Sequence, residues 1–368
     1  MRICDPPFFF MEHILSFIFF VNLGEIKFHV TLFACGSQAD RSMAPASAHV
    51  IQKKVIIDTD PGIDDAMAIL LAFQSPELDV IGLTTTFGNV STSMATQNAL
   101  HLCELAGRED IPVAQGLHKS LKGDTKEHAV DFIHGKDGLG NTNPPAPKGK
   151  PIDMTAPEFF ISKVKEFPGE VTIIALGPLT NLGKAVEMDP SFAKLVGEIV
   201  ILGGAFAVNG NVNPAAEANV LGDPLAADIV LTCGANTKII GINITHQVTM
   251  TGPQIEELRR SDSKYGRYLC DVIMCYLNYH RDYYNIDAIY LHDPATVIAA
   301  IDPSLFTYAE GVVRVQQEGI CRGLTLFNNT RKKWAVPTAW CNKPPVKVAV
   351  TVDADKLVVL LKERLMAS

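Results

Sequence analysis

The chain has 368 residues, of which 47% are hydrophobic and 20% are charged, and its formal net charge is -8 at pH 7. This length and composition are typical of a globular protein with one large α/β domain or two smaller ones. No basic block is present, which excludes the electrostatic footprint of a nucleic-acid-binding surface and leaves neutral or cationic small ligands open. The eight cysteines include no CxxC pair, so we expect reduced, buried thiols rather than a disulfide framework or a zinc site.

The first fifty residues differ in kind from the rest. The run "FFFMEHILSFIFFVNLG" resembles the apolar core of a signal peptide, but Glu12 and His13 interrupt it and no stretch reaches the ~20 residues of a membrane span. Three interpretations compete: a cleaved signal, an organelle-targeting extension, and an upstream translation artefact or isoform, since Met43 could itself be a start. The cysteine pattern favours the third. We therefore expect a targeting-like or disordered extension over residues 1–50 and a cytoplasmic protein; a functional targeting segment in residues 1–42 would instead indicate a secreted or organellar one.

From Lys54 onward, apolar β-branched runs alternate with amphipathic stretches, which predicts alternating strands and helices. The runs are continuously apolar, which favours a mostly parallel central sheet flanked by helices on both faces, a doubly wound α/β fold. Ser91 is a plausible N-cap, and Thr155 with Glu158 forms a capping-box pattern. The expected strands are "KVIID" (54–58), "LDVIGLTTTF" (78–87), "VTIIALG" (171–177), "EIVILGG" (198–204) and "TKIIGIN" (237–243), and the expected helices cover 91–107, 155–167, 179–189 and 265–284.

Polar segments follow several of these strands. In open parallel sheets, ligands bind beyond the carboxyl ends of the strands. The segments at those ends are "DTDPGIDD", "TFGN", "LGPLTN" and "GGAFAVNGNVNPAAEAN". We therefore expect the functional site at this edge of the sheet.

"DTDPGIDD" places four aspartates within eight positions, directly after the first strand. Carboxylates at this density raise one another's pKa values and cost stability unless a cation lies among them. Pro61 and Gly62 make a sharp turn, so Asp60 before it and Asp65 after it can face one point, while the last two acids open a helix whose positive end tolerates them. Oxygen ligands without histidine or cysteine favour calcium or magnesium over zinc.

Two other interpretations of these aspartates are open. They could cap the helix, although capping needs one acid rather than four. Alternatively, a DxD after the first strand is how haloacid-dehalogenase-type phosphatases present their nucleophile, and "GDPLAAD" (222–228) loosely echoes their later acidic motif. Against the phosphatase, the DxD is followed by Pro-Gly-Ile-Asp-Asp rather than by a Gly-Thr or similar step.

"DTDPGIDDA" resembles the N-terminal signature of the inosine-uridine preferring nucleoside hydrolases. The match continues in the family's order through "TTTFGNV", "IHGKDGLG", "LGPLTNL", "ILGGA", "GNVNPAAEAN" and "HDP", and it extends from about Lys54 to the end. The resemblance implies a single catalytic domain over residues 51–368. It also implies hydrolysis of the N-glycosidic bond of ribonucleosides of the uridine, inosine and xanthosine class to ribose and free base, in nucleoside salvage and catabolism.

The resemblance implies a calcium ion. Its ligands would be Asp60, Asp65, the backbone carbonyl of Thr180 and Asp293, with the ribose 2′ and 3′ hydroxyls completing the shell. Asp60 would be the general base that takes a proton from the attacking water. Asp58 would not touch the metal or the substrate but would hold the turn that carries these ligands in place.

The ribose contacts implied by the resemblance are carboxylates and amides, which suit a sugar because each hydroxyl both donates and accepts. Taken alone, the asparagines in "NGNVN" and "FGN" are typical of turns. Ala218 departs from the aromatic residue that the family more often has there, which bears on the shape of the sugar pocket. The implied ribose-contacting residues are Asp64, Asn89, Asn211, Glu217 and Asn219.

Two histidines match family positions near the base. His292 could donate a proton to the leaving base, or it could be a packed neighbour of a helix cap. His134 is expected on a loop that closes over the ligand. Tyr279 and Tyr283 lie four apart on one expected helix and could form a wall of the base pocket, although aromatic residues at helical spacing are usually core. The sequence leaves the identity of the leaving-group acid open.

A protein that binds nucleosides without cleaving them is the non-enzyme alternative, and the presence of Asp60 argues against it. The sequence leaves the preferred nucleobase open. The family usually forms homodimers or homotetramers, so we expect a homo-oligomer, with a small-molecule ribonucleoside as partner and neither nucleic acid nor membrane.

Overall fold

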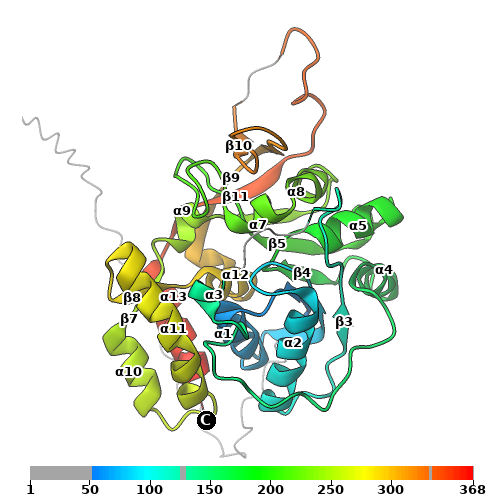
Figure 1. Ribbon diagram of the computed structural model, residues 1–368. Helices are drawn as coiled ribbons and strands as arrows, with labels where there is room; N and C mark the ends of the chain where they lie inside the picture. Colours follow the sequence, from blue (N-terminus) through cyan, green and yellow to red (C-terminus); the bar gives the residue numbers. More distant parts are fainter. Residues whose placement is uncertain (1–51, 125–129, 331–333, 368) are drawn as a thin grey trace, which may run out of the picture. The chain divides into compact units, whose positions relative to one another are not determined.

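The computed structural model describes residues 52–124, 130–330 and 334–367, which belong to a compact unit spanning His49–Ser368 (Figure 1). The extension expected over residues 1–50 lies outside the described residues. Six of the eight cysteines are described, and all six are free. Cys103 and Cys270 are buried, as expected, whereas Cys321 is exposed and the other three are half-buried. Cys4 and Cys35 lie outside the described residues. Among the described residues, no helix combines the length and the apolar character that crossing a membrane requires.

A nine-stranded sheet forms the centre of the fold, in the order β10-β9-β11-β6-β5-β4-β1-β2-β3. From β11 through β6, β5, β4, β1 and β2 to β3, neighbouring strands pair in parallel, which confirms the predicted sheet. β9 is antiparallel to both of its neighbours. The strands are β1 (Lys53–Thr59), β2 (Leu78–Thr85), β3 (Val113–Gln115), β4 (Thr172–Ala175), β5 (Glu198–Leu202), β6 (Thr237–Ile240), β9 (Phe306–Val315), β10 (Thr325–Asn328) and β11 (Val346–Val352).

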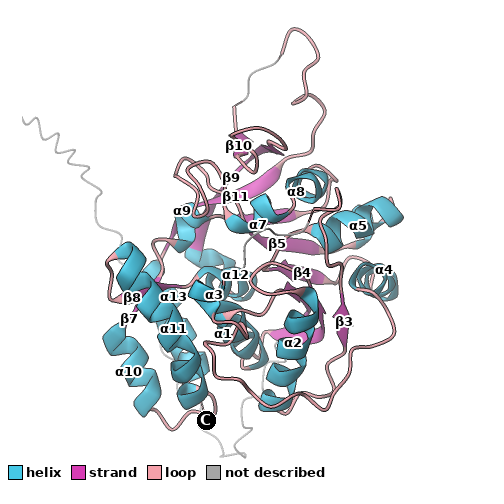
Figure 2. Ribbon diagram, viewed as in Figure 1, coloured by secondary structure: helices cyan, strands magenta, loops and turns pink. Residues whose placement is uncertain are grey.

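Helices cover both faces of this sheet, as Figure 2 shows. Side chains of β1 alternate between two cores: Val55 and Ile57 pack into one, and Ile56 into the other. Both cores are apolar, which explains why the central strands read as unbroken apolar runs. The first core includes α1 (Ile63–Phe73), α2 (Thr92–Ala106), α10 (Gly252–Arg260), α11 (Gly266–Tyr284), α12 (His292–Ile301) and α13 (Ala354–Leu365), and the second includes α4 (Ala156–Glu166), α5 (Thr180–Met188), α6 (Phe192–Leu195) and α8 (Pro224–Leu231).

The remaining elements are short. β7 and β8 form a separate antiparallel pair near α11. Both predicted helix starts are observed: the Ser91 hydroxyl caps α2, and Thr155 and Glu158 form a capping box at α4. The short elements are α3 (Asp131–His134), α7 (Ala218–Gly222), α9 (Ile242–Thr245), the 3-10 helix η1 (Pro303–Leu305), β7 (Thr249–Thr251) and β8 (Ala288–Tyr290).

Candidate active site

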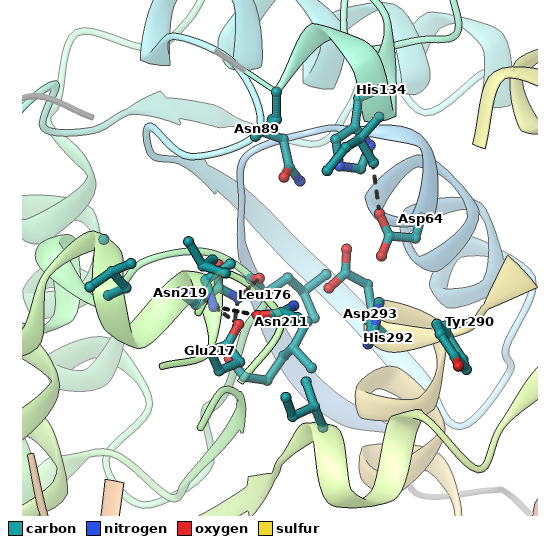
Figure 3. Close-up of a pocket in the computed structure, with 18 of the residues that line it drawn as sticks. Asp64, Asn89, His134, Leu176, Asn211, Glu217, Asn219, Tyr290, His292 and Asp293 are labelled. Carbon is teal, nitrogen blue, oxygen red and sulfur yellow. Dashed lines mark hydrogen bonds and ion pairs between the residues drawn. The ribbon is translucent and has the colours of Figure 1, made fainter. Parts of the chain in front are cut away.

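A pocket of about 990 Å³ opens at the carboxyl end of the parallel strands. Leu176 and Leu202, which lie at the ends of β4 and β5, and Ile242 just beyond β6, form part of its lining. This is the edge at which the sequence predicts the site. Of the residues singled out from the sequence, the pocket is lined by Asp64, Asn89, His134, Asn211, Glu217, Asn219, Tyr279, His292 and Asp293, most of which are labelled in Figure 3.

Asp65 shapes the turn between β1 and α1. One of its carboxylate oxygens accepts hydrogen bonds from the Thr59 hydroxyl (2.5 Å) and the Asp60 backbone N–H (3.2 Å). The other accepts from the Gly62 backbone N–H (3.0 Å) and the Asn89 side-chain amide (2.9 Å). Four donors converge on one buried carboxylate, so the turn has a single conformation into which the neighbouring acids are placed.

Asp64, Asp65 and Asp293 form a buried cluster in which one carboxylate oxygen from each lies within 4.8 Å of the others. Burial raises the pKa of Asp64 to about 8, with a further contribution from the charge of Asp65. The pKa of Asp293 is raised well above its usual range by burial and by its acidic neighbours. Asp64 Oδ1 is buried and makes no hydrogen bond within the described residues. Three buried oxygen donors fit a hard divalent cation, since no lysine or arginine in the described part of the chain forms an ion pair with them.

Asp60 lies beside this cluster and is 1% exposed. Its Oδ2 accepts a hydrogen bond from the Asn89 backbone N–H at 2.6 Å. Gly88 and Gly177 leave room for this carboxylate, because a Cβ at either position would lie 1.9 Å or 2.5 Å from its oxygens. Thr180 is buried as the first residue of α5, and its hydroxyl donates to Asp223 (2.9 Å).

Asp58 is the second-last residue of β1 and is fully buried. Its Oδ1 accepts hydrogen bonds from the Thr84 hydroxyl (2.7 Å) and the Asn181 side-chain amide (2.9 Å). Burial raises its pKa to about 7, against the lowering effect of these two bonds. Asn181 also donates to Thr85 O and accepts from Leu117 N, so this side chain joins the ends of β1 and β2 to the loop after β3.

Glu217, just before α7, and Asn219, on α7, line the pocket and also form hydrogen bonds that hold the local structure. Glu217 is the N-cap of α7 and accepts from the backbone of Gly204, Asn219 and Val220. The Asn219 amide donates to the carbonyls of Leu176 (2.6 Å) and Leu202 (3.3 Å), so it spans the ends of β4 and β5. These bonds hold the two side chains in fixed orientations at the pocket wall.

His134 and His292 both line the pocket, and each has its Nδ1 held by the protein. His134 Nδ1 accepts from the Ile63 backbone N–H (3.1 Å) and lies 4.0 Å from Asp64 Oδ1. His292 Nδ1 lies 2.6 Å from the Thr245 hydroxyl. The pKa of His292 is lowered well below its usual value by burial first and then by neighbouring histidines.

Aromatic residues form another part of the lining. Tyr279 is among the lining residues, whereas Tyr283 is 68% exposed, contacts Phe132 and does not belong to the lining. Several further lining residues were not predicted from the sequence. Three of them are Tyr276, His280 and Tyr284, which lie four apart on α11. This spacing places them on one helix face and could have identified them from the sequence. Tyr290 and Phe132 also line the pocket.

His280 is locked as a neutral ring. Its Nδ1 donates to the Tyr276 carbonyl (2.8 Å) and its Nε2 accepts from the Tyr290 backbone N–H (3.3 Å). Burial lowers its pKa to about 4. This side of the pocket therefore has aromatic rings and an uncharged imidazole, in contrast to the buried carboxylates of the cluster.

Comparison with known proteins places these features in a family. Residues 55–358 match the model of the inosine-uridine preferring nucleoside hydrolases. The chain is 62% identical to "Probable uridine nucleosidase 2" of Arabidopsis thaliana over 86% of its length and 98% of the relative. It is 51% identical to "Uridine nucleosidase 1" of the same plant, over 85% of its length and 93% of the relative. The solved structure of the plant nucleoside hydrolase PpNRh1 superposes with a TM-score of 0.85 at 67% identity, covering 86% of this chain and 99% of that one.

Proposed function

Because the chain belongs to the inosine-uridine preferring nucleoside hydrolase family, we propose that the pocket holds the ribose of a nucleoside against the buried acids and its base among the aromatic rings. The protein is a ribonucleoside hydrolase of the uridine nucleosidase type, which uses water to split the N-glycosidic bond into ribose and free base. The phosphatase alternative is set aside by the match over residues 55–358. The observation that carries the proposal is one pocket lined both by carboxylates that suit a sugar and by rings that suit a base.

We propose uridine as the preferred nucleoside. The support is the similarity to plant proteins that are named uridine nucleosidases, at 62% and 51% identity. A pyrimidine is a small planar base, and a pocket edge of tyrosine and neutral histidine rings offers it stacking surfaces without a buried charge. Inosine and xanthosine are the competing substrates to be measured beside it.

The cation that we propose is Ca²⁺, and the residues fit it. Asp65 and Asp293 of the expected ligand set are in the observed cluster, and Asp64, expected as a ribose contact, joins them. Asp60 and the Thr180 carbonyl remain proposed ligands. When bound, the cation supplies positive charge that orients the ribose hydroxyls and lowers the pKa of a water molecule.

The catalytic base that we propose is Asp60. Its carboxylate is buried and is oriented by the Asn89 backbone, so it can take a proton from a water molecule that attacks the anomeric carbon. The reaction passes through an oxocarbenium-like transition state, in which nearby carboxylates stabilise the positive charge on the sugar. Asp58 supports Asp60 through the strand end and its bonds to Thr84 and Asn181.

The ribose would be held by side chains from three separate segments, each kept in position by its own hydrogen bonds. Asn89 follows β2, Asn211 and Glu217 precede α7, and Asn219 lies on it. Since the Asn211 carbonyl oxygen already accepts from Ala218 N, its amide N–H group is the part left for a hydroxyl.

We also propose a cytoplasmic homo-oligomer, a homodimer or homotetramer, that acts in nucleoside salvage and catabolism. The free state of the six described cysteines supports a reducing compartment. Sedimentation of the purified chain would measure the number of subunits directly.

The assignment is tested by incubating the protein with uridine or inosine and calcium and measuring reducing-sugar release. We expect ribose from the wild type. Asp60→Asn should bind uridine but lose most turnover, because an amide cannot accept the proton. No ribose from any common ribonucleoside would overturn the assignment, and hydrolysis of 4-nitrophenyl phosphate with magnesium would reinstate the phosphatase.

A further inference from the structure

Thr245 is buried behind the pocket wall, at the end of α9, and its hydroxyl contacts a pocket-lining histidine. The Thr245 Oγ1 lies 2.6 Å from His292 Nδ1. Thr245 is 0% exposed. Because Nδ1 faces Thr245, the opposite ring nitrogen, Nε2, is the one left for the pocket that His292 lines.

The direction of this hydrogen bond follows from the partners of the hydroxyl. Within the described residues, His292 Nδ1 is the only hydrogen-bond partner of Thr245 Oγ1. If the hydroxyl accepted from Nδ1–H, its own hydrogen would have no acceptor in a buried place, which costs more than an unused lone pair. The hydroxyl therefore donates to Nδ1. A neutral imidazole carries one N–H, so the hydrogen of His292 is on Nε2.

We propose that Thr245 is a positioning residue that holds His292 with its Nε2–H directed into the pocket, where the leaving base accepts a hydrogen bond from it. His280 provides the contrast within the same wall. Its Nδ1 donates to Tyr276 O and its Nε2 accepts from Tyr290 N, so it has no N–H to offer a ligand. The tautomer of each histidine is thus set by the group behind it, and the two rings have opposite tautomers.

The chemical role of this N–H is to stabilise the departing base, an inference that rests on the proposed function. As the water oxygen bonds to the anomeric carbon and its proton passes to Asp60, the C–N bonding pair leaves with the base. For uridine, that charge spreads to the carbonyl oxygens of the ring, which are hydrogen-bond acceptors. A donor in a water-poor pocket stabilises such developing charge. On release the base anion takes a proton from solvent water, and Asp60 returns its proton to solvent, so that ribose and neutral base are the products.

The test compares Thr245→Val, which removes the hydroxyl, with Thr245→Ser, which keeps it, on two substrates. Uridine has a poor leaving group, whereas 4-nitrophenyl β-D-ribofuranoside releases a phenolate that needs little stabilisation. We expect Thr245→Val to lower kcat/KM for uridine by about 10–100-fold, the range seen when a metal-ligating histidine loses the hydrogen-bond partner that orients it. The loss on the nitrophenyl riboside should stay below about threefold, and Thr245→Ser should recover most of the uridine rate.

Thr237→Val is the matched control. Thr237 is also buried, and its hydroxyl donates to the Ala235 carbonyl at the start of β6, the end opposite to the pocket. This variant should leave the rate on both substrates unchanged while reporting the general cost of replacing a buried threonine hydroxyl. Melting temperatures of all variants show whether each is folded.

A second readout does not depend on activity. Long-range ¹H–¹⁵N spectra of ¹⁵N-histidine-labelled protein at neutral pH identify which ring nitrogen of His292 carries the hydrogen, with His292→Gln for assignment. We expect Nε2–H in the wild type and a mixture of tautomers in Thr245→Val. Nδ1–H in the wild type, full uridine activity in Thr245→Val, or an equal loss on both substrates would each overturn the proposal. A wild type that cleaves no nucleoside would overturn the proposed function instead, and the spectra would still decide the tautomer.

Discussion

Two acids of the "DTDPGIDD" turn, Asp58 and Asp64, have pKa values above the usual range for aspartate. Asp64 is buried beside two other carboxylates, and Asp58 is fully buried with only one oxygen bonded. Burial is the leading cause that raises the pKa of each, to about 8 and about 7. The folded chain therefore retains protons on these groups near neutral pH unless a cation replaces them.

This has a consequence for stability without a cation. An unfolded carboxyl titrates near pH ~4, so the stabilising contribution of protonated Asp58 and Asp64 is complete below that pH and is lost as pH rises through about 7 and about 8. The buried histidines His280 and His292, whose pKa values are lowered, act in the opposite direction, but only below pH ~6.5. We expect the chelator-treated protein to lose about 2–3 kcal/mol of unfolding free energy between about pH 6.5 and 8, measured by urea denaturation.

Calcium provides the control for this pH dependence. A bound cation keeps the carboxylates ionised and paired, so the slope between these pH values should shrink when calcium is added. Asp64→Asn should also flatten the profile in chelator, because Asp64 has the higher pKa of the two groups. Stability that rises with pH over this range in chelator would contradict the assignment of the raised pKa values.

At the scale of elements, the loops after β2 and β4 leave space for the proposed base through two glycines. Alanine at Gly88 would place a Cβ 1.9 Å from Asp60 Oδ2, and the backbone at Gly88 is not in the left-handed region, so the clash is the main effect. We expect Gly88→Ala to fold but to lose turnover of uridine by about 100-fold, the scale on which a misplacement of about 1 Å acts. Steady-state kinetics with calcium measure the loss.

Gly149→Ala is the matched substitution for this comparison. The nearest neighbour of its Cβ would be the end of the Leu100 side chain at 3.3 Å, and neither Gly149 nor Leu100 lines the pocket. Its turnover should equal that of the wild type. Normal turnover in Gly88→Ala would mean that displacing the Asp60 carboxylate leaves the reaction rate unchanged. This would contradict its role as general base, which depends on its position.

The elements that the sequence predicted correctly are those in which local and tertiary forces agree. β1, β4 and β5 are covered on both faces and show this as unbroken apolar runs. β9 was not predicted, because it lies near the edge of the sheet and its burial is interrupted along its length. Its antiparallel pairing with β11 depends on contacts between distant segments, which a local pattern does not encode.

For the site, the same distinction applies. The acids of the turn at 58–65 could be predicted as functional from the sequence. Four like charges within eight residues repel one another in any fold unless a cation or protons neutralise them. Which acids share the cluster was only partly predicted: Asp64 joins Asp65 and Asp293, although a ribose contact had been expected of it. Thr245 gave no signal at all, since a buried threonine becomes informative only when its partner, 47 positions away, is known.

At the scale of the whole molecule, the pocket is assembled from segments that span most of the described chain, from Asp64 to Arg322. The parallel strands β1, β2, β4, β5 and β6 bring part of the pocket together, because they end at one edge and residues that follow them line it. The rings of α11 come from outside the sheet. Rigid strands with a core on each face therefore fix the acids relative to the rings. The arrangement predicts that the sugar and the cation bind as one unit.

The 2′ hydroxyl tests that unit. If the cation and the polar wall both use the vicinal hydroxyls, 2′-deoxyuridine loses a ligand to the cation and leaves buried polar groups unpaired, a penalty that reaches factors of ~10⁴ where a site is built around one hydroxyl. We expect deoxyuridine to be cleaved at least ~10³-fold more slowly than uridine, by kcat/KM with calcium present. Chelation should lower both the melting temperature and the affinity for uridine, because a cation that binds only the folded chain stabilises it. Two results together would contradict this: equal turnover of the two nucleosides, and a melting temperature that the chelator does not change. The buried acids would then bind neither the ribose hydroxyls nor a cation, because neither ligand would depend on them.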